Sequence, residues 1–259
     1  MDTDAVLSLM REVAEQVINP RFRALLDHQV SEKNPGDLVT VADHESEVLL
    51  TKALSNAYPD AVVLGEEAFA LDPTLLDRYN GAEHAFTVDP VDGTKNFVHG
   101  SPDHAVMIGE LRSGEVVRGW IWQPQHDAAY VAERGAGAYF NGERLTMAGP
   151  GLDGEPPPPY RTARRAWVGR ELPGLGVLEL TWACCGVDYP RLIAGDARAI
   201  VYNHSKPWDH LPGSLLVQES GGWIGSKEGG PFAPQGLGGG LVSAPDRATY
   251  DAVVAALAA

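Results

Sequence analysis

The segment from Asp89 to Phe97, DPVDGTKNF, carries two carboxylates three residues apart, directly after the apolar run from Ala85 to Val88. A strand over that run delivers both carboxylates to its carboxyl end. The intervening proline fixes φ and the glycine after Asp92 permits a tight turn, so Asp89, Asp92 and the Val91 carbonyl can converge as oxygen ligands. Hard cations such as Mg²⁺ bind oxygen and keep several waters, so few protein ligands suffice. The segment therefore predicts a divalent-cation site.

The same segment also offers a place for an anion. If a helix begins at Gly93, the backbone N–H groups of Gly93 and Thr94 have no partner within the helix and can bind a phosphate group. Metal and phosphate would then be neighbours, which is the arrangement that phosphoryl chemistry requires.

Further carboxylates stand at element ends elsewhere in the chain. Glu66 and Glu67 follow the apolar run Val63-Leu64-Gly65, and Asp209 lies just before a helix predicted from Leu211. Asp43 belongs to Thr40-x-x-Asp43, which has the form of a capping box. One such carboxylate alone is usually a solvated residue or a cap, but their combination favours a shared metal site.

The elements that must position these residues follow from hydrophobic spacing and turn signals. A helix capped by Thr3 or Asp4 is expected to run to Pro20, and a second from about Thr40 to Asn56. Short strands dominate after that, and turn signals between the later ones predict an antiparallel meander. The expected strands cover residues 61–64, 85–88, 104–111, 115–122 and 128–132.

A Pro- and Gly-rich stretch, residues 149–159, can neither continue a helix nor join a central strand, and it predicts a domain boundary. Residues 1–148 are expected to form an α+β domain with an antiparallel sheet and most of the metal ligands. Residues 149–259 are expected to form a smaller α/β domain that contributes Asp209 and the substrate pocket. Its expected strands are 166–168, 178–183 and 199–201, and its expected helices are 189–194, 211–220 and 244–257.

The composition and net charge of the chain limit the classes of binding partner that we expect. Of 259 residues, 44% are hydrophobic and 21% charged, as in globular proteins, and 20 basic against 35 acidic side chains give a net charge of −15. That charge repels phosphate backbones and anionic membranes, so neither a nucleic acid polymer nor a membrane is an expected partner. Without a signal-peptide pattern or a run of ~18 apolar residues, a cytoplasmic location is expected. The two cysteines, Cys184 and Cys185, are adjacent and are expected to stay reduced.

Four ordered motifs point to a family. The chain resembles the inositol monophosphatase family of lithium-sensitive, Mg²⁺-dependent phosphatases, and the resemblance implies a layered α-β-α-β-α sugar-phosphatase fold of mixed α+β and α/β character, commonly as a homodimer. The motifs are DLVTxxD at residues 37–43, GEE at 65–67, DPVDGT at 89–94, and Trp208-Asp209 followed by Gly213 and by ESGG at 219–222.

The resemblance also implies roles for individual residues. Two Mg²⁺ ions, with a third possible, would be held by the side chains of Glu66, Asp89, Asp92 and Asp209 and by the Val91 carbonyl, with Asp89 bridging. Thr94, hydrogen-bonded to Asp43, would orient the attacking water together with Glu66, and the Gly93 and Thr94 amides would hold phosphate.

The substrate is less defined, because Tyr202 stands where relatives commonly carry an acidic residue that contacts sugar hydroxyls. A small phosphorylated metabolite is expected, with inositol monophosphate as the first candidate. Histidinol phosphate, fructose 1,6-bisphosphate and 3′-phosphoadenosine phosphates are the alternatives, and a catalytically silent metal- or phosphate-binding protein is a different class. Candidates for the leaving-group pocket are Cys185, Asp188, Tyr189, Tyr202 and His210, and Arg161, Arg164 and Arg165 can either meet a second anionic group or form a solvated basic turn.

Overall fold

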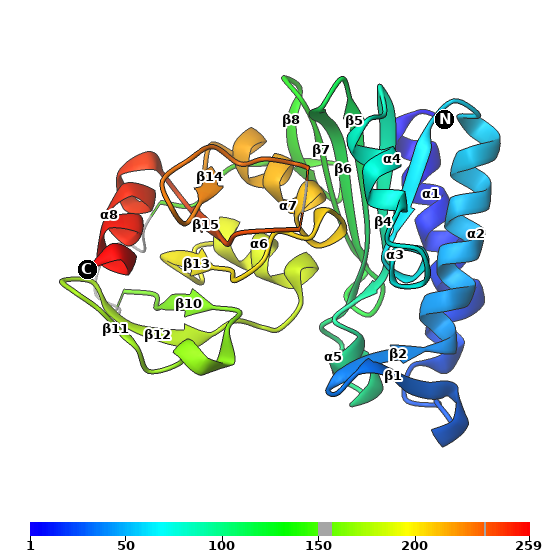
Figure 1. The fold of residues 1–259 in the computed structure, drawn as a ribbon, viewed down its shortest axis with the longest axis horizontal. Coiled ribbons are helices and arrows are strands. Elements are labelled where there is room, and N and C mark those ends of the chain that lie inside the picture. The colour runs from blue at the N-terminus through cyan, green and yellow to red at the C-terminus, as the bar shows by residue number, and fades with distance from the viewer. Residues whose placement is uncertain (150–156, 236) are drawn as a thin grey trace.

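Two large β-sheets alternate with three layers of helices, and a two-stranded hairpin forms a separate small sheet. The computed structural model describes residues 1–149, 157–235 and 237–259. Figure 1 shows, from right to left, a helical layer, a large sheet, a second helical layer, a smaller sheet and a final helix. This order confirms the layered fold that the sequence resemblance implied. Among the described residues, no helix combines the length and hydropathy needed to cross a lipid bilayer.

The large sheet has seven strands in chain order, and its pairing explains how the acidic motifs meet. All neighbours pair antiparallel except the first two, which are parallel, with Gly65 beside Val88. Since parallel strands end at the same edge, the residues after both strands lie side by side. The strands are β3 (Val62–Gly65), β4 (His84–Asp92), β5 (Ala105–Arg112), β6 (Glu115–Gln123), β7 (Ala128–Glu133), β8 (Gly137–Phe140) and β9 (Glu143–Leu145).

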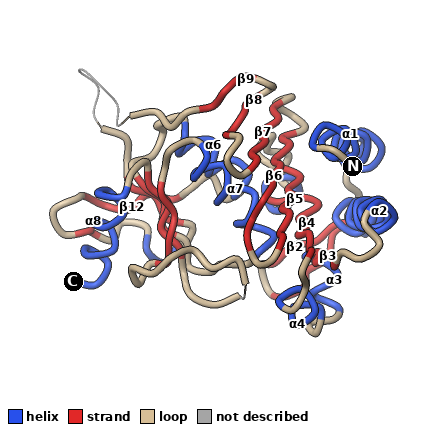
Figure 2. Tube along the Cα trace, turned by 90° about the horizontal axis from the view of Figure 1, so that it is seen from above, coloured by secondary structure: helices blue, strands red, loops and turns tan. Residues whose placement is uncertain are grey.

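Two helices cover the outer face of this sheet. Helix α1 (Thr3–Val13) continues through a π-helical turn (Ala14–Ile18) and a 3₁₀ turn, and it packs beside α2 (Val41–Ala57). Figure 2 shows both on one side of the sheet, with α6 and α7 on the other. The expected cap of α1 was wrong, because Asp2 accepts the hydrogen bond from the Ala5 N–H at 2.8 Å. The capping box of α2 is confirmed: Thr40 N donates to Asp43 Oδ2 at 2.9 Å.

The middle layer joins the two halves of the chain. Helices α6 (Cys185–Ile193) and α7 (Pro207–Glu219) lie between the sheets, and one buried cluster unites their apolar side chains with those of the large sheet. Both helices begin four residues earlier than expected, and each carries an internal proline, Pro190 or Pro212, which weakens the sequence signal for a helix. The earlier starts place Cys185 and Asp209 in the first turns of the two helices.

The smaller sheet has six strands, in the order β11-β12-β10-β13-β15-β14, and α8 (Arg247–Ala258) packs on its outer face. The strand expected at 166–168 was wrong, because Arg165–Trp167 form a 3₁₀ turn. Much of the expected boundary segment lies outside the described residues, so the domain division stays a prediction. The strands are β10 (Tyr160–Thr162), β11 (Glu171–Leu172), β12 (Gly176–Leu180), β13 (Ala199–Val201), β14 (Trp223–Ser226) and β15 (Leu241–Ala244).

Smaller elements flank the large sheet. A hairpin precedes α2, and three short helices follow β3, the next loop and β4. They are β1 (Val30–Asn34), β2 (Asp37–Thr40), α3 (Glu66–Leu71), α4 (Leu75–Asn80) and α5 (Thr94–Val98).

Close approach between layers depends on glycine. A Cβ at Gly213 on α7 would lie 1.9 Å from a Tyr189 ring atom on α6, and one at Gly119 on β6 would lie 2.8 Å from the Pro212 Cα. No side chain fits at these distances. The two glycines therefore fix how deeply α7 sits between α6 and the large sheet.

We predict that Gly213→Ala lowers the free energy of unfolding by about 2–3 kcal/mol, because the methyl group forces the fully buried Tyr189 ring to move. Gly81→Ala is the matched control, since a Cβ there meets only ordinary contacts from 3.5 Å outward and the residue has a helical φ of −92°. Chemical denaturation measures both, and equal stability of the two variants would contradict this packing.

Candidate active site

Three of the four carboxylates expected to bind metal meet at the carboxyl edge of β3 and β4. Glu66 begins α3 directly after β3, Asp89 lies near the end of β4, and Asp209 lies in the first turn of α7. One carboxylate oxygen from each lies within 4.8 Å of the other two. Asp89 and Asp209 are buried, at 2% and 8% exposure.

Asp92 joins this edge from the same strand but is oriented by a neighbouring helix. Its Oδ2 accepts hydrogen bonds from the Gly186 N–H at 2.5 Å and from the Cys184 thiol at 3.0 Å, both at the start of α6. Regular strands turn residues three apart to opposite faces, but the register of β4 against β5 shifts between Asp89 and Asp92. That irregularity lets both carboxylates serve one edge of the sheet.

The turn after Asp92 brings together the expected water-orienting pair. Thr94 Oγ1 lies 3.0 Å from Asp43 Oδ1 and 3.0 Å from the Val91 carbonyl oxygen. Gly93 has a left-handed φ of 81°, and a Cβ there would lie 3.0 Å from Cys184 Cβ, so only glycine makes this turn without strain. Gly93 and Thr94, the expected phosphate-binding residues, stand at the N-terminus of α5.

Burial and mutual repulsion govern the protonation of these groups. Burial raises the pKa of Asp89 well above its usual value, and the charges of Glu66, Asp92 and Asp209 raise it further. Burial also raises the pKa of Asp209, although the Lys206 charge opposes the rise. Asp92 has a raised pKa from burial despite the hydrogen bonds from α6. A hard divalent cation binds carboxylate oxygens and offsets the free-energy cost of ionising these buried groups. The residues therefore fit Mg²⁺.

Two lysines that sequence reasoning missed stand against this cluster. Lys33 Nζ lies 2.8 Å from Glu66 Oε1 and 2.9 Å from Glu67 Oε1, and Lys206 Nζ lies 3.8 Å from Glu66 Oε1. Lys33 comes from the β1–β2 hairpin, 33 residues before Glu66, so no local pattern connects them. Lys206 stands just before the Trp208-Asp209 motif, and that proximity was the available signal.

Glu47 was also missed, and it positions Glu66. Its carboxylate accepts the Glu67 and Ala68 N–H groups at 2.8 and 2.7 Å, which caps α3 at its N-terminus. A Cβ at Gly65 would lie 2.2 Å from the Glu47 carboxyl carbon, so glycine leaves room for this contact. The available signal was a second acidic residue one helical turn after Asp43 on the buried stripe of α2.

A cavity opens beside Glu66. It has a volume of about 540 Å³ and is lined mainly by β1, β2 and α3 together with Lys206 and Trp208. A larger cavity of about 760 Å³ lies between the start of α1 and strands β7 and β8, and it shares no lining residue with the first. Of the two, only the smaller cavity is lined by a member of the carboxylate cluster, Glu66, so it is the candidate entrance for a ligand.

The residues expected to bind the leaving group do not line that cavity. Cys185, Asp188, Tyr202 and His210 are all buried, and none lines the described cavities. Their role in substrate binding stays a prediction.

The expected second anion site also stays a prediction. Arg161 stacks on Trp182 at 4.3 Å and donates to the Leu180 carbonyl, and Arg164 lies over Trp167 at 4.9 Å.

Comparison with known proteins defines the class. The family model described as the inositol monophosphatase family matches residues 2–259, so the chain belongs to that family, as the motifs indicated. It is a phosphoric monoester hydrolase by this membership.

The chain is also similar to individual members of known function or structure. The inositol-1-monophosphatase of Mesorhizobium japonicum is 32% identical, covering 89% of this chain and 88% of its own. The Nus factor SuhB of Pseudomonas aeruginosa is 30% identical, covering 75% and 74%. Among solved structures, the extragenic suppressor protein suhB of Bartonella henselae has a TM-score of 0.75 at 27% identity, covering 98% of each chain. An IMPase/NADP phosphatase complexed with Mg²⁺ and phosphate has a TM-score of 0.79 at 21% identity, covering 98% and 93%, which shows a shared fold.

We predict that the metal-free protein loses stability as pH rises from about 6.5 to about 8.5. Burial raises the pKa of Asp43 and of Glu47 to about 7, and it also raises the pKa of Asp89 well above its usual value. The unfolded chain has already ionised these groups at pH 6.5, so unfolding releases the protons that the folded state still holds, and a rising pH favours that release until the folded groups have ionised as well.

The histidines do not reverse this expectation. Desolvation lowers the pKa of His104 and of His204 to about 4 and that of the fully buried His210 well below its usual value, and these shifts act mainly below pH 6.5. In chelator, the melting temperature is expected to fall by about 5 °C between pH 6.5 and 8.5, which corresponds to a loss of about 2 kcal/mol in the free energy of unfolding. Excess Mg²⁺ should abolish most of the fall. A melting temperature that rises with pH in chelator, or one that Mg²⁺ leaves unchanged, would contradict the described electrostatics.

Proposed function

We propose that the protein is a Mg²⁺-dependent phosphatase of a small phosphate monoester, with an inositol monophosphate as the first candidate. The observation that carries the proposal is the convergence of Glu66, Asp89 and Asp209 within 4.8 Å at the end of two parallel strands. A protein of net charge −15 repels a phosphate dianion, so cations held by these oxygens would have to link the phosphate group to the protein.

The proposed metal ligands divide into two sets. Glu66, Asp89 and the Val91 carbonyl would hold one Mg²⁺, and Asp89, Asp92 and Asp209 the other, with a third ion possible. Bound divalent ions in such sites lower the pKa of a water and offset charge on the leaving oxygen. The helix start that anchors Asp92 and the Glu47 cap on α3 would keep these ligands in place before substrate arrives.

The remaining residues would orient the reacting groups. With its proton donated to Asp43, the Thr94 hydroxyl would present lone pairs to a water and accept a hydrogen bond from it, with Glu66 as a second acceptor. The Gly93 and Thr94 amides at the start of α5 would bind phosphate oxygens. The catalytic contribution is placement and electrostatics, as for other phosphoryl transfers.

The names of relatives support inositol monophosphate and keep alternatives in view. Besides two inositol-1-monophosphatases, an Aquifex aeolicus relative at 27% identity is named fructose-1,6-bisphosphatase/inositol-1-monophosphatase. Lithium inhibition, a homodimer and a cytoplasmic location complete the proposal. The silent binding protein is disfavoured because the Thr94–Asp43 contact and the three converging carboxylates are retained together.

The test is phosphate release from inositol 1-phosphate, histidinol phosphate, fructose 1,6-bisphosphate and 3′-phosphoadenosine 5′-phosphate, with Mg²⁺ and with or without Li⁺. We predict that Asp89→Asn lowers kcat/KM by at least ~10³-fold, about 4 kcal/mol, because it removes the ligand shared by both ions.

The matched control is Asp60→Asn, the same change at an exposed position of the turn before β3, which should leave turnover unchanged. Near-normal turnover in Asp89→Asn would refute the assignment. No turnover on any substrate despite Mg²⁺ binding would favour the silent alternative.

A further inference from the structure

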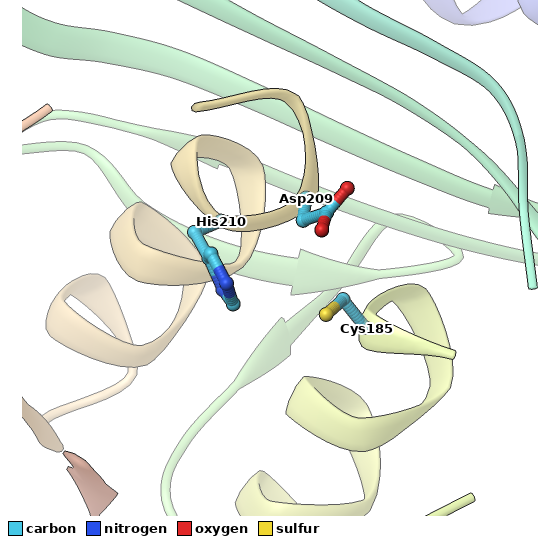
Figure 3. A group of neighbouring side chains, drawn as sticks. All are labelled: Cys185, Asp209 and His210. Atoms are coloured by element: carbon cyan, nitrogen blue, oxygen red, sulfur yellow. The ribbon is translucent and has the colours of Figure 1, made fainter. Parts of the chain in front are cut away.

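A second group of potential ligands shares Asp209 with the carboxylate cluster. A carboxylate oxygen of Asp209, the Cys185 sulfur and a ring nitrogen of His210 all lie within 4.8 Å of one another. Figure 3 shows the three side chains entering the same space, with Asp209 and His210 from one helix and Cys185 from another.

The fold places these residues firmly. Cys185 is the first residue of α6, and Asp209 and His210 are consecutive residues in the first turn of α7. The close α6–α7 contact that glycine permits at Gly213 holds the two helix starts against each other. His210 is fully buried, and the other two are each 8% exposed. The arrangement is therefore a built interior site and not a surface coincidence.

An independent observation on His210 points to a ligand. Its Nδ1 lies 2.8 Å from the Tyr189 hydroxyl, whereas its buried Nε2 makes no hydrogen bond of good geometry among the described residues, although the backbone of His204 lies close to the ring. With the proton on Nδ1, donated to the Tyr189 oxygen, Nε2 presents its lone pair. Metal-binding histidines show this pattern, one ring nitrogen on the ion and the other fixed by a hydrogen bond.

The donor types select the ion. Thiolate, imidazole and carboxylate together suit Zn²⁺ and its optical substitute Co²⁺, whereas Mg²⁺ prefers oxygen alone. Tetrahedral Zn²⁺ bonds of about 2.0–2.3 Å separate the ligand atoms by about 3.5 Å, so atoms within 4.8 Å of one another need to close by no more than about 1.3 Å. Three protein ligands leave a fourth position for water.

We propose that Cys185, Asp209 and His210 form a Zn²⁺-type site that competes with the Mg²⁺ site for Asp209. On binding, the Cys185 thiol releases its proton to the solvent as the sulfur–metal bond forms, without any change of oxidation state. Occupation would withdraw Asp209 from the proposed magnesium ligands, so Zn²⁺ would inhibit hydrolysis. This consequence for activity rests on the proposed function, but metal binding itself does not.

The binding test uses Co²⁺ on the full chain without Mg²⁺. Wild type should show a near-ultraviolet thiolate-to-Co²⁺ charge-transfer band, and Cys185→Ser should lose it and bind Zn²⁺ at least about 100-fold more weakly. Cys184→Ser is the matched control, because the chain has two cysteines and the introduced serine retains a hydroxyl for the Asp92 hydrogen bond. The band should persist there. Absence of the band in wild type, or its persistence in Cys185→Ser, would overturn the proposal.

The inhibition test compares Zn²⁺ inhibition within each variant, relative to its own Mg²⁺-supported rate. Zn²⁺ should inhibit wild type and Cys184→Ser alike, and Cys185→Ser should need at least about tenfold more Zn²⁺. Equal sensitivity of all three would overturn the competition for Asp209. If no variant hydrolyses any substrate, the proposed function fails while the charge-transfer band still decides the site.

Discussion

The fold buries several carboxylates close together, and the repulsion between them is the constraint that the other elements must offset. Asp89, Asp92 and Asp209 each have a pKa raised first by burial and then by one another or by Glu66. Such a cluster opposes folding unless positive charge neutralises it. Lys33 and Lys206 supply part of that charge through Glu66. The remaining cost is what divalent cations would remove, and the same excess of negative charge would favour binding of metal ions together with a phosphate group.

The surrounding structure serves to hold the acidic groups in place despite this repulsion. Parallel pairing of β3 and β4 brings two motifs to one edge, and the first turn of α7 brings the third. Hydrogen bonds fix the individual carboxylates: the start of α6 binds Asp92, Glu47 caps the helix that carries Glu66, and Thr40 binds Asp43. Gly213, where α7 meets α6, allows the starts of the two helices to approach.

Sequence reasoning succeeded where the signal was local. The DPVDGT motif after an apolar strand, the capping box at Thr40 and the turns of the meander each depend on neighbouring residues, and the structure has all three elements. It failed where tertiary contacts decide. Lys33 reaches Glu66 from a distant hairpin, and Arg165–Trp167 form a 3₁₀ helix where the apolar residues 166–168 predicted a strand. Internal prolines weakened the sequence signal for α6 and α7, so the predicted helix starts were four residues too late. The proximity of Cys185 and Asp209 could therefore not be predicted.

Asp209 stands between two proposed ligand sets, one of oxygen alone and one with sulfur and nitrogen, so the identity of the bound ion would decide its role. Anomalous diffraction from crystals soaked in Mn²⁺, a scattering substitute for Mg²⁺, tests whether the carboxylates form one cage for hard cations. We expect peaks within bonding distance of the Asp89 carboxylate, with Glu66 or Asp209 completing each ion's ligands. Fully ordered crystals with these side chains in place and no peak beside Asp89 would contradict the presence of this cage.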